Sequence, residues 1–286
     1  MKRIVLCALS LFFAVLAPAQ SRLVTESIQS KILGTEVKYN VYLPAGYSPA
    51  QEYPVIYLLH GLYGVYSDWQ EKGRMKDVAD ELIASGELVP VVIVMPNAGH
   101  EDVHHVQNGY FNVQDWPYED FFFQELMPTA EGAYHCGGSK GRRAIMGLSM
   151  GGGGSIVYAQ RHPELFSSSY GMSAWLDSKN RPDRENLDKT DKLYIVNQSV
   201  IDHSALDFMD KADKATLEAL KTVKWFLDCG DDDGLMMLSV DLYRKMRMAG
   251  LAAELRVRNG GHTWEYWHSA LRTSFPFASR NFSPSL

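Results

Sequence analysis

The chain has 286 residues, of which 28 are Lys or Arg and 34 are Asp or Glu, so its formal net charge is −6. This acidic excess, with no basic cluster, argues against nucleic acid and anionic membranes as partners. Hydrophobic residues make up 46% of the sequence, enough for a sizeable core, and neither an internal repeat nor a low-complexity linker divides it.

The N-terminus has the three parts of a secretory signal peptide. Lys2 and Arg3 precede a mostly apolar run over residues 4–16, and Ala17-Pro18-Ala19 has the small residues of a cleavage site. The apolar run is shorter than the ~20 residues that a membrane span needs. We therefore expect cleavage after Ala19, a mature chain of residues 20–286 with a net charge of −8, and a secreted or periplasmic protein that does not bind membranes.

The first predicted elements are strands. Apolar and polar residues alternate over 37–43, and together with residues 23–32 and a turn at Gly34 they predict an N-terminal antiparallel hairpin. Residues 55–59 and 91–95 are continuous apolar runs, as expected for parallel strands buried on both faces.

Helical spacing of apolar residues follows at 78–83 and 118–134. Further on, strands are expected at 167–172, 223–227 and 254–258, the last at an edge because it alternates strictly, with a helix over 235–248. This order predicts a single α/β domain with a mostly parallel, doubly wound sheet. The polar stretch 177–221 is not needed for that core, so we expect an inserted lid above the site.

Two cysteines remain after removal of the leader. Cys136 precedes the expected strand that leads into residue 149, whereas Cys229 ends a strand parallel to it. The two side chains would then lie at opposite ends of the sheet, beyond the reach of a disulfide, so we expect two free thiols.

Gly147-Leu148-Ser149-Met150-Gly151 is the most informative stretch of the chain. It lies between an apolar segment at 143–146 and helical spacing at 155–161, and it fits the nucleophile elbow of α/β-hydrolases. Glycines continue to Gly154, although each disfavours a helix interior by ~1 kcal/mol relative to alanine. These glycines would be justified if the helix approaches the neighbouring strand closely on one side and a substrate on the other. The motif predicts Ser149 as the nucleophile of a serine hydrolase.

Serine needs a base, and the base needs an orienting acid; in this fold the acid precedes the histidine in the chain. The expected strand at 223–227 is followed by Asp228, Asp231, Asp232 and Asp233, any of which could be the acid, although Asp233 is preferred. His262 follows the last strand, after two glycines that let its loop turn inward. We expect His262 to be the base.

An oxyanion needs N–H donors in a dry site. Met150 provides one backbone donor, and Leu62 in the segment His60-Gly61-Leu62-Tyr63-Gly64 is expected to provide the other, with Gly61 contacting substrate. His60 is expected to hold this loop through side-chain hydrogen bonds.

Other residues are assigned to the pocket. His100, His104 and His105 with Glu101 and Asp102 match no strong zinc pattern, so we expect no metal and a loop that lines the pocket. Aromatic walls are expected from Trp264, Trp175 and Tyr110, and Phe111 and Trp116 are further candidates. Each of these rings fits an ordinary core equally well. No cofactor is expected.

Four segments together resemble the esterase D-like superfamily: residues 57–61, 94–97, 147–152 and 261–267. That superfamily includes feruloyl and acetyl-xylan esterases of carbohydrate esterase family one, S-formylglutathione hydrolases, tributyrin esterases and mycolyltransferases. Residues 227–233 and 256–262 look most like secreted bacterial feruloyl esterases. The resemblance implies an α/β-hydrolase fold and places the acid on Asp233, whereas 177–221 matches no family pattern.

The expected protein is therefore a secreted serine esterase that forms an acyl-enzyme on Ser149. The resemblance and the leader favour feruloyl or acetyl esters of plant polysaccharides or oligosaccharides as substrates. A general short-chain esterase and a siderophore esterase are the main alternatives. An S-formylglutathione hydrolase fits less well because that substrate is cytosolic, and a catalytically silent carbohydrate-binding module is disfavoured by the complete triad order. The oligomeric state is left open.

Overall fold

The structure, a computed structural model, describes residues 20–99, 108–180 and 186–283. The expected signal peptide at 1–19 and the histidine-rich segment at 100–105 lie outside these residues. Within the described part, no helix is both long and apolar enough to span a membrane.

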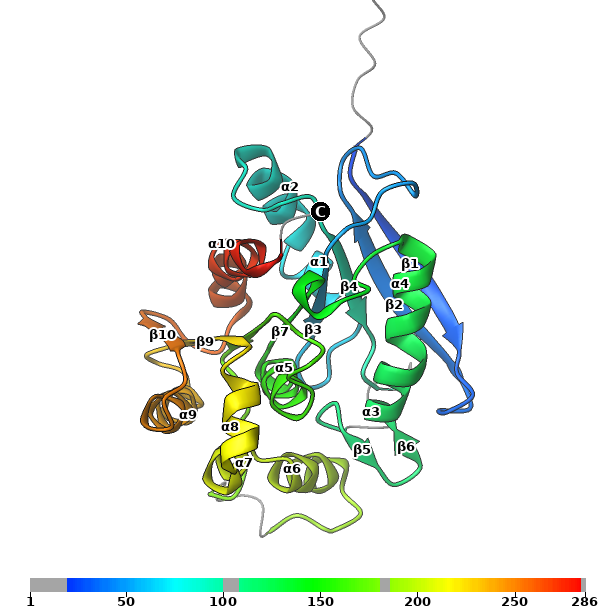
Figure 1. Ribbon diagram of the computed structural model, residues 1–286. Helices are drawn as coiled ribbons and strands as arrows, with labels where there is room; N and C mark the ends of the chain where they lie inside the picture. The colour runs from blue at the N-terminus through cyan, green and yellow to red at the C-terminus, as the bar shows by residue number, and fades with distance from the viewer. Residues whose placement is uncertain (1–19, 100–107, 181–185, 284–286) are drawn as a thin grey trace, which may run out of the picture.

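An eight-stranded sheet forms the centre of the molecule (Figure 1). Its strand order is β1-β2-β4-β3-β7-β8-β9-β10, and every pair from β4 onward is parallel. The strands are β1 (Arg22–Gln29), β2 (Glu36–Leu43), β3 (Val55–Leu59), β4 (Val92–Pro96), β7 (Arg143–Leu148), β8 (Ser168–Met172), β9 (Lys224–Gly230) and β10 (Ala253–Arg258). A separate small hairpin contains β5 (Asn112–Val113) and β6 (Trp116–Pro117).

Helices cover both faces of this sheet (Figure 1). One face packs against α2 (Met75–Ser85) and α10 (Trp264–Asn281), and the other against α4 (Met127–Tyr134), α5 (Ser149–Arg161) and α9 (Met236–Met248). The remaining helical segments are α1 (Asp68–Glu71), α3 (Tyr118–Phe121), η1 (Phe122–Leu126), η2 (Lys140–Arg142), α6 (Lys192–Asp202), α7 (Ala205–Lys211) and α8 (Lys214–Leu220). The α/β-hydrolase class expected from the sequence is confirmed.

The N-terminal hairpin and the edge strand are as predicted. β1 and β2 pair antiparallel along their whole length, and the chain turns between them at Gly34, whose φ is +69°. β10 pairs only with β9 in the sheet order and is the second edge. The central strands β3 and β4 are buried along their whole length, as their unbroken apolar sequences predict.

The strand directions place the site. β3, β7, β9 and β10 are parallel, so the loops after Leu59, Leu148, Gly230 and Arg258 all leave the same edge of the sheet. Ligands of open α/β sheets bind at this carboxyl edge. Ser149, Asp233, His262 and the loop that begins at His60 follow these four strand ends.

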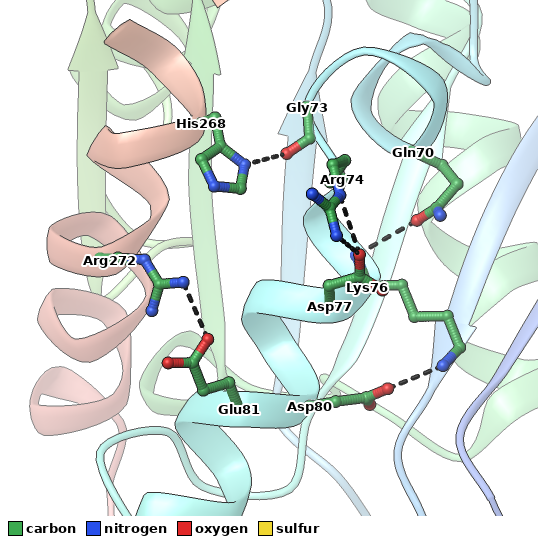
Figure 2. A network of polar contacts seen from close by, with 9 residues as sticks. All are labelled: Gln70, Gly73, Arg74, Lys76, Asp77, Asp80, Glu81, His268 and Arg272. Atoms are coloured by element: carbon green, nitrogen blue, oxygen red, sulfur yellow. Dashed lines mark hydrogen bonds and ion pairs between the residues drawn. The ribbon is translucent and has the colours of Figure 1, made fainter. Parts of the chain in front are cut away.

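Helix α10 begins directly after the His262 loop and was not predicted. Figure 2 shows how it is tied to the segment around α2: His268 Nδ1 lies 2.8 Å from the Gly73 carbonyl oxygen, and Arg272 Nη2 donates to Glu81 at 2.8 Å. Gly73 has little free space, because a Cβ there would lie 3.1 Å from the Trp264 ring. These contacts fix the start of α10 against the body of the domain.

The polar stretch 177–221 connects β8 to β9 and contains α6, α7 and α8. Helix α7 packs on α5 and α9, and Ala205 and Met209 on its inner side are buried in the main core. The described part of this segment is thus a packed wall beside α9.

Both thiols are free and buried, as expected from their positions in the sheet. Burial raises the pKa of Cys136 and of Cys229 to about 12. Neither side chain is therefore a reactive thiolate near neutral pH.

Candidate active site

Ser149 occupies the turn between β7 and α5 in a strained conformation. Its φ is +53°, in the left-handed region that residues with a Cβ rarely adopt. The turn is tight, because a Cβ on Gly147 would lie 2.5 Å from the carbonyl oxygen of Gly151. The side chain is 8% exposed and lines a cavity at the carboxyl edge of the sheet. The expected strand and helix around the elbow are therefore present.

The glycines after Ser149 have packing reasons. A Cβ on Gly151 would lie 2.4 Å from the carbonyl oxygen of His60, and one on Gly153 would lie 2.1 Å from that of Trp175. Gly154 faces the ring of Tyr110 at 3.0 Å. The helix thus approaches the end of β3, as expected. At Gly153 and Gly154 the helix contacts other residues of the protein, Trp175 and Tyr110. The sequence had suggested that a substrate would approach the helix there.

The imidazole of His262 lies between Ser149 and Asp233. His262 Nε2 is 3.0 Å from Ser149 Oγ, and His262 Nδ1 is 2.8 Å from Asp233 Oδ2. These distances are those of hydrogen bonds. They allow Nε2 to accept the serine proton while Nδ1–H donates to the carboxylate.

The four aspartates that the sequence could not separate have different surroundings. Only Asp233 contacts His262; Asp231 accepts a hydrogen bond from the Gly260 N–H at 3.0 Å, and Asp232 is exposed. Asp228 is fully buried and is bound by two tyrosine hydroxyls. The geometry therefore favours Asp233 as the partner of the histidine.

Asp233 is held as a carboxylate. Burial alone raises its pKa, but hydrogen bonds from His262, from the Leu235 N–H and from Ser173 outweigh that effect and leave the pKa below its ordinary value. The carboxylate side chain is 1% exposed, whereas that of His262 is 39% exposed. The histidine can thus reach a substrate while its partner stays shielded from water.

The loop after β3 lies directly beside Ser149. A Cβ on Gly61 would lie 3.6 Å from Ser149 Cβ, and both Gly61 and Leu62 line the cavity. Met150 is the second residue of α5, where backbone N–H groups have no acceptor within the helix. Leu62 thus lies in the loop beside Ser149 and Met150 follows it directly, and their role as oxyanion donors stays a prediction.

His60 has the structural role expected from its position. The Ala98 N–H donates to its Nε2 at 3.0 Å, so the ring proton resides on Nδ1 and is donated to the Gly61 carbonyl oxygen at 2.8 Å. Burial lowers the pKa of His60 to about 4. A neutral imidazole therefore joins the loops after β3 and β4.

The cavity in front of Ser149 has a volume of about 1240 Å³. Gly61, Trp175 and Trp264 line it, as expected. Tyr110 does not line it: this ring is fully buried behind Gly154, and its hydroxyl donates to the His60 carbonyl oxygen at 2.9 Å. The expectation that Tyr110 lines the pocket is corrected: its buried ring instead supports the loop after β3 through the hydrogen bond to His60.

Phe111 and Trp116 are also core residues. Phe111 stacks on His203 with ring centroids 4.1 Å apart, and Trp116 Nε1 donates to the Ala98 carbonyl oxygen at 3.1 Å. Residues 177–180, α7 and α9 also line the cavity. In the described ranges, no group of three or more His, Cys, Asp or Glu side chains is arranged to hold a metal ion.

Comparison with known proteins identifies the family. A model described as "Putative esterase" matches residues 30–278. The chain belongs to this esterase family. A solved ferulic acid esterase is 43% identical to this esterase chain, with a TM-score of 0.87 over 93% of the chain and 100% of that structure. The predicted relationship, fold and enzyme class, that of carboxylic ester hydrolases, are confirmed at the level of the family.

Curated relatives of this chain include other esterases. An acetyl esterase of Caldicellulosiruptor saccharolyticus is 23% identical over 79% of this esterase chain and 83% of its own length. An endo-1,4-beta-xylanase/feruloyl esterase of Xylanibacter ruminicola is 34% identical over 44% of the chain, which corresponds to 18% of the relative. The match with Esterase MT1326 of Mycobacterium tuberculosis covers 30% of that relative, so the chain spans less than a third of the length of both proteins.

Sequence reasoning missed two residues at the site. Trp267 packs against His262, and its Nε1 donates to Ser173 Oγ at 3.0 Å. Ser173 follows β8 with a φ of +47° and is fully buried. The helical spacing of apolar residues at the start of α10 was the available signal for Trp267, whereas no local pattern distinguishes Ser173.

Proposed function

We propose that the protein is a serine carboxylic ester hydrolase that acts through an acyl-enzyme on Ser149. The observation that carries this proposal is the pair of hydrogen bonds that joins Ser149, His262 and Asp233. A buried serine in a strained elbow, aligned with a histidine and a carboxylate, is the arrangement that activates a hydroxyl.

In the first half of the reaction, Ser149 Oγ attacks the ester carbonyl carbon while His262 Nε2 takes its proton. Asp233 holds the imidazole through Nδ1–H and stabilises the charge that the ring then carries. The Leu62 and Met150 N–H groups bind the developing oxyanion. When the tetrahedral intermediate collapses, the alcohol leaves with the proton from His262, and the acyl group stays on Ser149.

In the second half, water enters from the cavity. His262 Nε2 takes a proton from this water as its oxygen attacks the acyl carbon. The second tetrahedral intermediate expels Ser149 Oγ, which recovers the proton from His262, and the free acid leaves. The partial exposure of His262 fits a base that must meet both alcohol and water.

For the substrate, we propose feruloyl or acetyl esters on plant cell-wall polysaccharides or oligosaccharides, cleaved by a protein exported with residues 1–19 as its leader. A cavity of about 1240 Å³ is large for a simple acetyl ester and suits an aromatic acyl group or several sugars. The aromatic walls Trp175 and Trp264 suit such groups. The names of the ferulic acid esterase structure and of the Xylanibacter relative point the same way.

The catalytic assignment is tested with Ser149→Ala, assayed on nitrophenyl acetate and with a fluorophosphonate probe. We expect folded protein, measured by circular dichroism, with no turnover and no labelling. Near-normal turnover by this variant would exclude the acyl-enzyme mechanism.

The substrate assignment is tested by measuring ferulate and acetate released from xylan fragments, with tributyrin as the comparison. We expect the purified protein to release at least one of the two acids from the fragments. Activity on tributyrin alone would make the protein a general short-chain esterase.

A further inference from the structure

Asp228 is a buried carboxylate that the proposed mechanism does not use. It lies in β9 and is fully buried, yet Tyr170 donates a hydrogen bond to Oδ2 at 2.6 Å and Tyr266 donates one to Oδ1 at 2.5 Å. The Arg258 guanidinium Nε is 3.7 Å from Oδ1. Burial of a carboxylate is costly unless its oxygens are bound, so these three partners make its presence tolerable.

Tyr266 joins this carboxylate to the loop that carries His262. Gly260 has a φ of +143°, and a Cβ there would lie 2.6 Å from the Tyr266 ring. On the opposite side, a Cβ on Gly230 would lie 2.0 Å from the Gly260 carbonyl oxygen. Gly260 is thus enclosed between the end of β9 and the ring of Tyr266, and neither Gly230 nor Gly260 has space for a side chain.

The same tyrosine is also linked to the other side of His262. Its backbone N–H donates to Thr263 Oγ1 at 3.4 Å, and its carbonyl oxygen accepts from Arg258 Nη2 at 2.9 Å. The Arg258 guanidinium stacks on the ring at 3.6 Å. Burial, together with the hydrogen bond to Asp228, raises the pKa of Tyr266, so its hydroxyl remains a donor.

We infer that Asp228 and Tyr266 are positioning residues that hold the His262 loop at hydrogen-bonding distance from Ser149. The inference rests on the proposed function. Asp228 anchors the hydroxyl of Tyr266, the ring of Tyr266 fixes Gly260, and Gly260 sets the path of the chain into His262. Neither residue touches the substrate in this arrangement.

The chain provides a matched control for the test. Tyr170→Phe and Tyr266→Phe each remove one hydroxyl donor from the same carboxylate. Tyr170 lies in β8 and stacks on Phe226, whereas Tyr266 is the one that contacts Gly260. A purely structural role of Asp228 predicts similar effects of the two substitutions, and a positioning role predicts different ones.

We expect Tyr266→Phe to lower kcat on nitrophenyl acetate about tenfold, because small misplacements of a catalytic base are costly. KM should stay near the wild-type value, since acylation and deacylation both depend on His262. Tyr170→Phe should retain wild-type kcat, although urea denaturation should show a similar loss of stability in both variants. Equal kcat values for the two variants, whether lowered or unchanged, would overturn the inference.

A second readout does not depend on esterase activity. The His262 Nδ1 proton, shared with Asp233, should give a low-field proton resonance that broadens in Tyr266→Phe and persists in Tyr170→Phe. Inactive wild-type protein would refute the proposed function, but this resonance would still test the positioning of the imidazole. The same resonance in both variants would refute the inference alone.

Discussion

The indole of Trp267 packs edge-on against the imidazole of His262, with ring centroids 4.9 Å apart and ring planes at 89°. The contact restricts rotation of the imidazole. Because Trp267 Nε1 is itself bound to Ser173, the indole cannot easily turn aside. The histidine is therefore held by a hydrogen bond at each nitrogen and by a ring at its edge.

Replacement of the acid should have a large effect on chemistry. Asp233→Asn should lower kcat by about 10³- to 10⁴-fold, because an amide does not stabilise the imidazolium and favours the wrong tautomer. Asp232→Asn is the matched control: it changes an exposed neighbouring carboxylate and should retain kcat. Steady-state kinetics on nitrophenyl acetate measures both variants. Comparable losses in the two would remove Asp233 from its assigned role.

Addition of a single methyl group should distinguish two helical glycines. Gly153→Ala should destabilise the protein by about 3 kcal/mol, because the new Cβ would overlap the Trp175 carbonyl oxygen. Gly132→Ala lies in α4 with no atom near its Cβ position and should stabilise by about 0.5–1 kcal/mol. The free energy of unfolding in urea checks both values. A neutral Gly153→Ala would contradict the close approach of α5 to residue 175.

Stability should fall as the pH decreases below 6.5, because of His60. Its pKa is about 4 in the folded protein and about 6.5 when unfolded, so acid protonates the unfolded chain first. This stabilisation is complete above pH 6.5 and is lost as the pH falls toward 4. Between pH 6.5 and pH 5 the loss from His60 should be about 1.5 kcal/mol, since one pKa unit corresponds to ~1.36 kcal/mol and the unfolded chain is already half protonated at pH 6.5.

The variant His60→Gln separates this contribution from those of other groups. Glutamine does not titrate, so the pH slope of its unfolding free energy in this window should be smaller than that of the wild type. The absolute stability of the variant is not the readout. Identical slopes would show that His60 is not buried in its neutral form.

The cavity should discriminate against negatively charged esters. Among the described residues, its lining contains six aspartates and three lysines: Asp68, Asp177, Asp207, Asp210, Asp233 and Asp241 with Lys72, Lys179 and Lys245. We expect kcat/KM for a neutral ester to exceed that for a matched ester with a carboxylate on the alcohol by about threefold or more at low salt. The ratio should approach one at about 1 M salt, where charges are screened beyond ~3 Å.

Asp241 provides the variant for this comparison. It lies in α9 on the cavity wall and makes no contact with the triad that the structure records, so Asp241→Asn should retain kcat on the neutral ester. The same change should reduce the preference for the neutral ester. A preference that is independent of both salt and Asp241 would have to come from shape instead of charge.

Patterns of neighbouring residues in the sequence predicted the strands and the turn at Ser149. Continuous apolar runs identified β3 and β4, because a strand buried on both faces needs apolar residues at every position. Strict alternation identified β10 as an edge strand, because a strand buried on one face needs them only at every second position. The elbow was visible because a strained turn requires glycine at defined positions. The start of α10 was missed, although Tyr266, Trp267, Ala270 and Leu271 have the spacing of a buried helical face.

Long-range contacts were the parts that could not be predicted. Asp228 and Asp233 are five residues apart, and which one meets His262 depends on how the chain turns after Gly230, which no local pattern reveals. An aromatic residue such as Tyr110 is typical of a pocket wall. In the structure, however, Gly154 of α5 packs directly on the Tyr110 ring, which is buried and hydrogen-bonded to His60. Ser173 acquires its role only when β8 and α10 are brought together.

The segment between β8 and β9 builds one wall of the cavity but contains neither the serine, the acid nor the histidine. The three proposed catalytic residues therefore lie outside a segment that lines part of the cavity. Exchange of residues 177–221 between relatives would replace the wall while the strands that hold Ser149, Asp233 and His262 stay in place. On the proposed function, such an exchange would change the ester that fits the cavity and leave the three residues that cleave it unchanged.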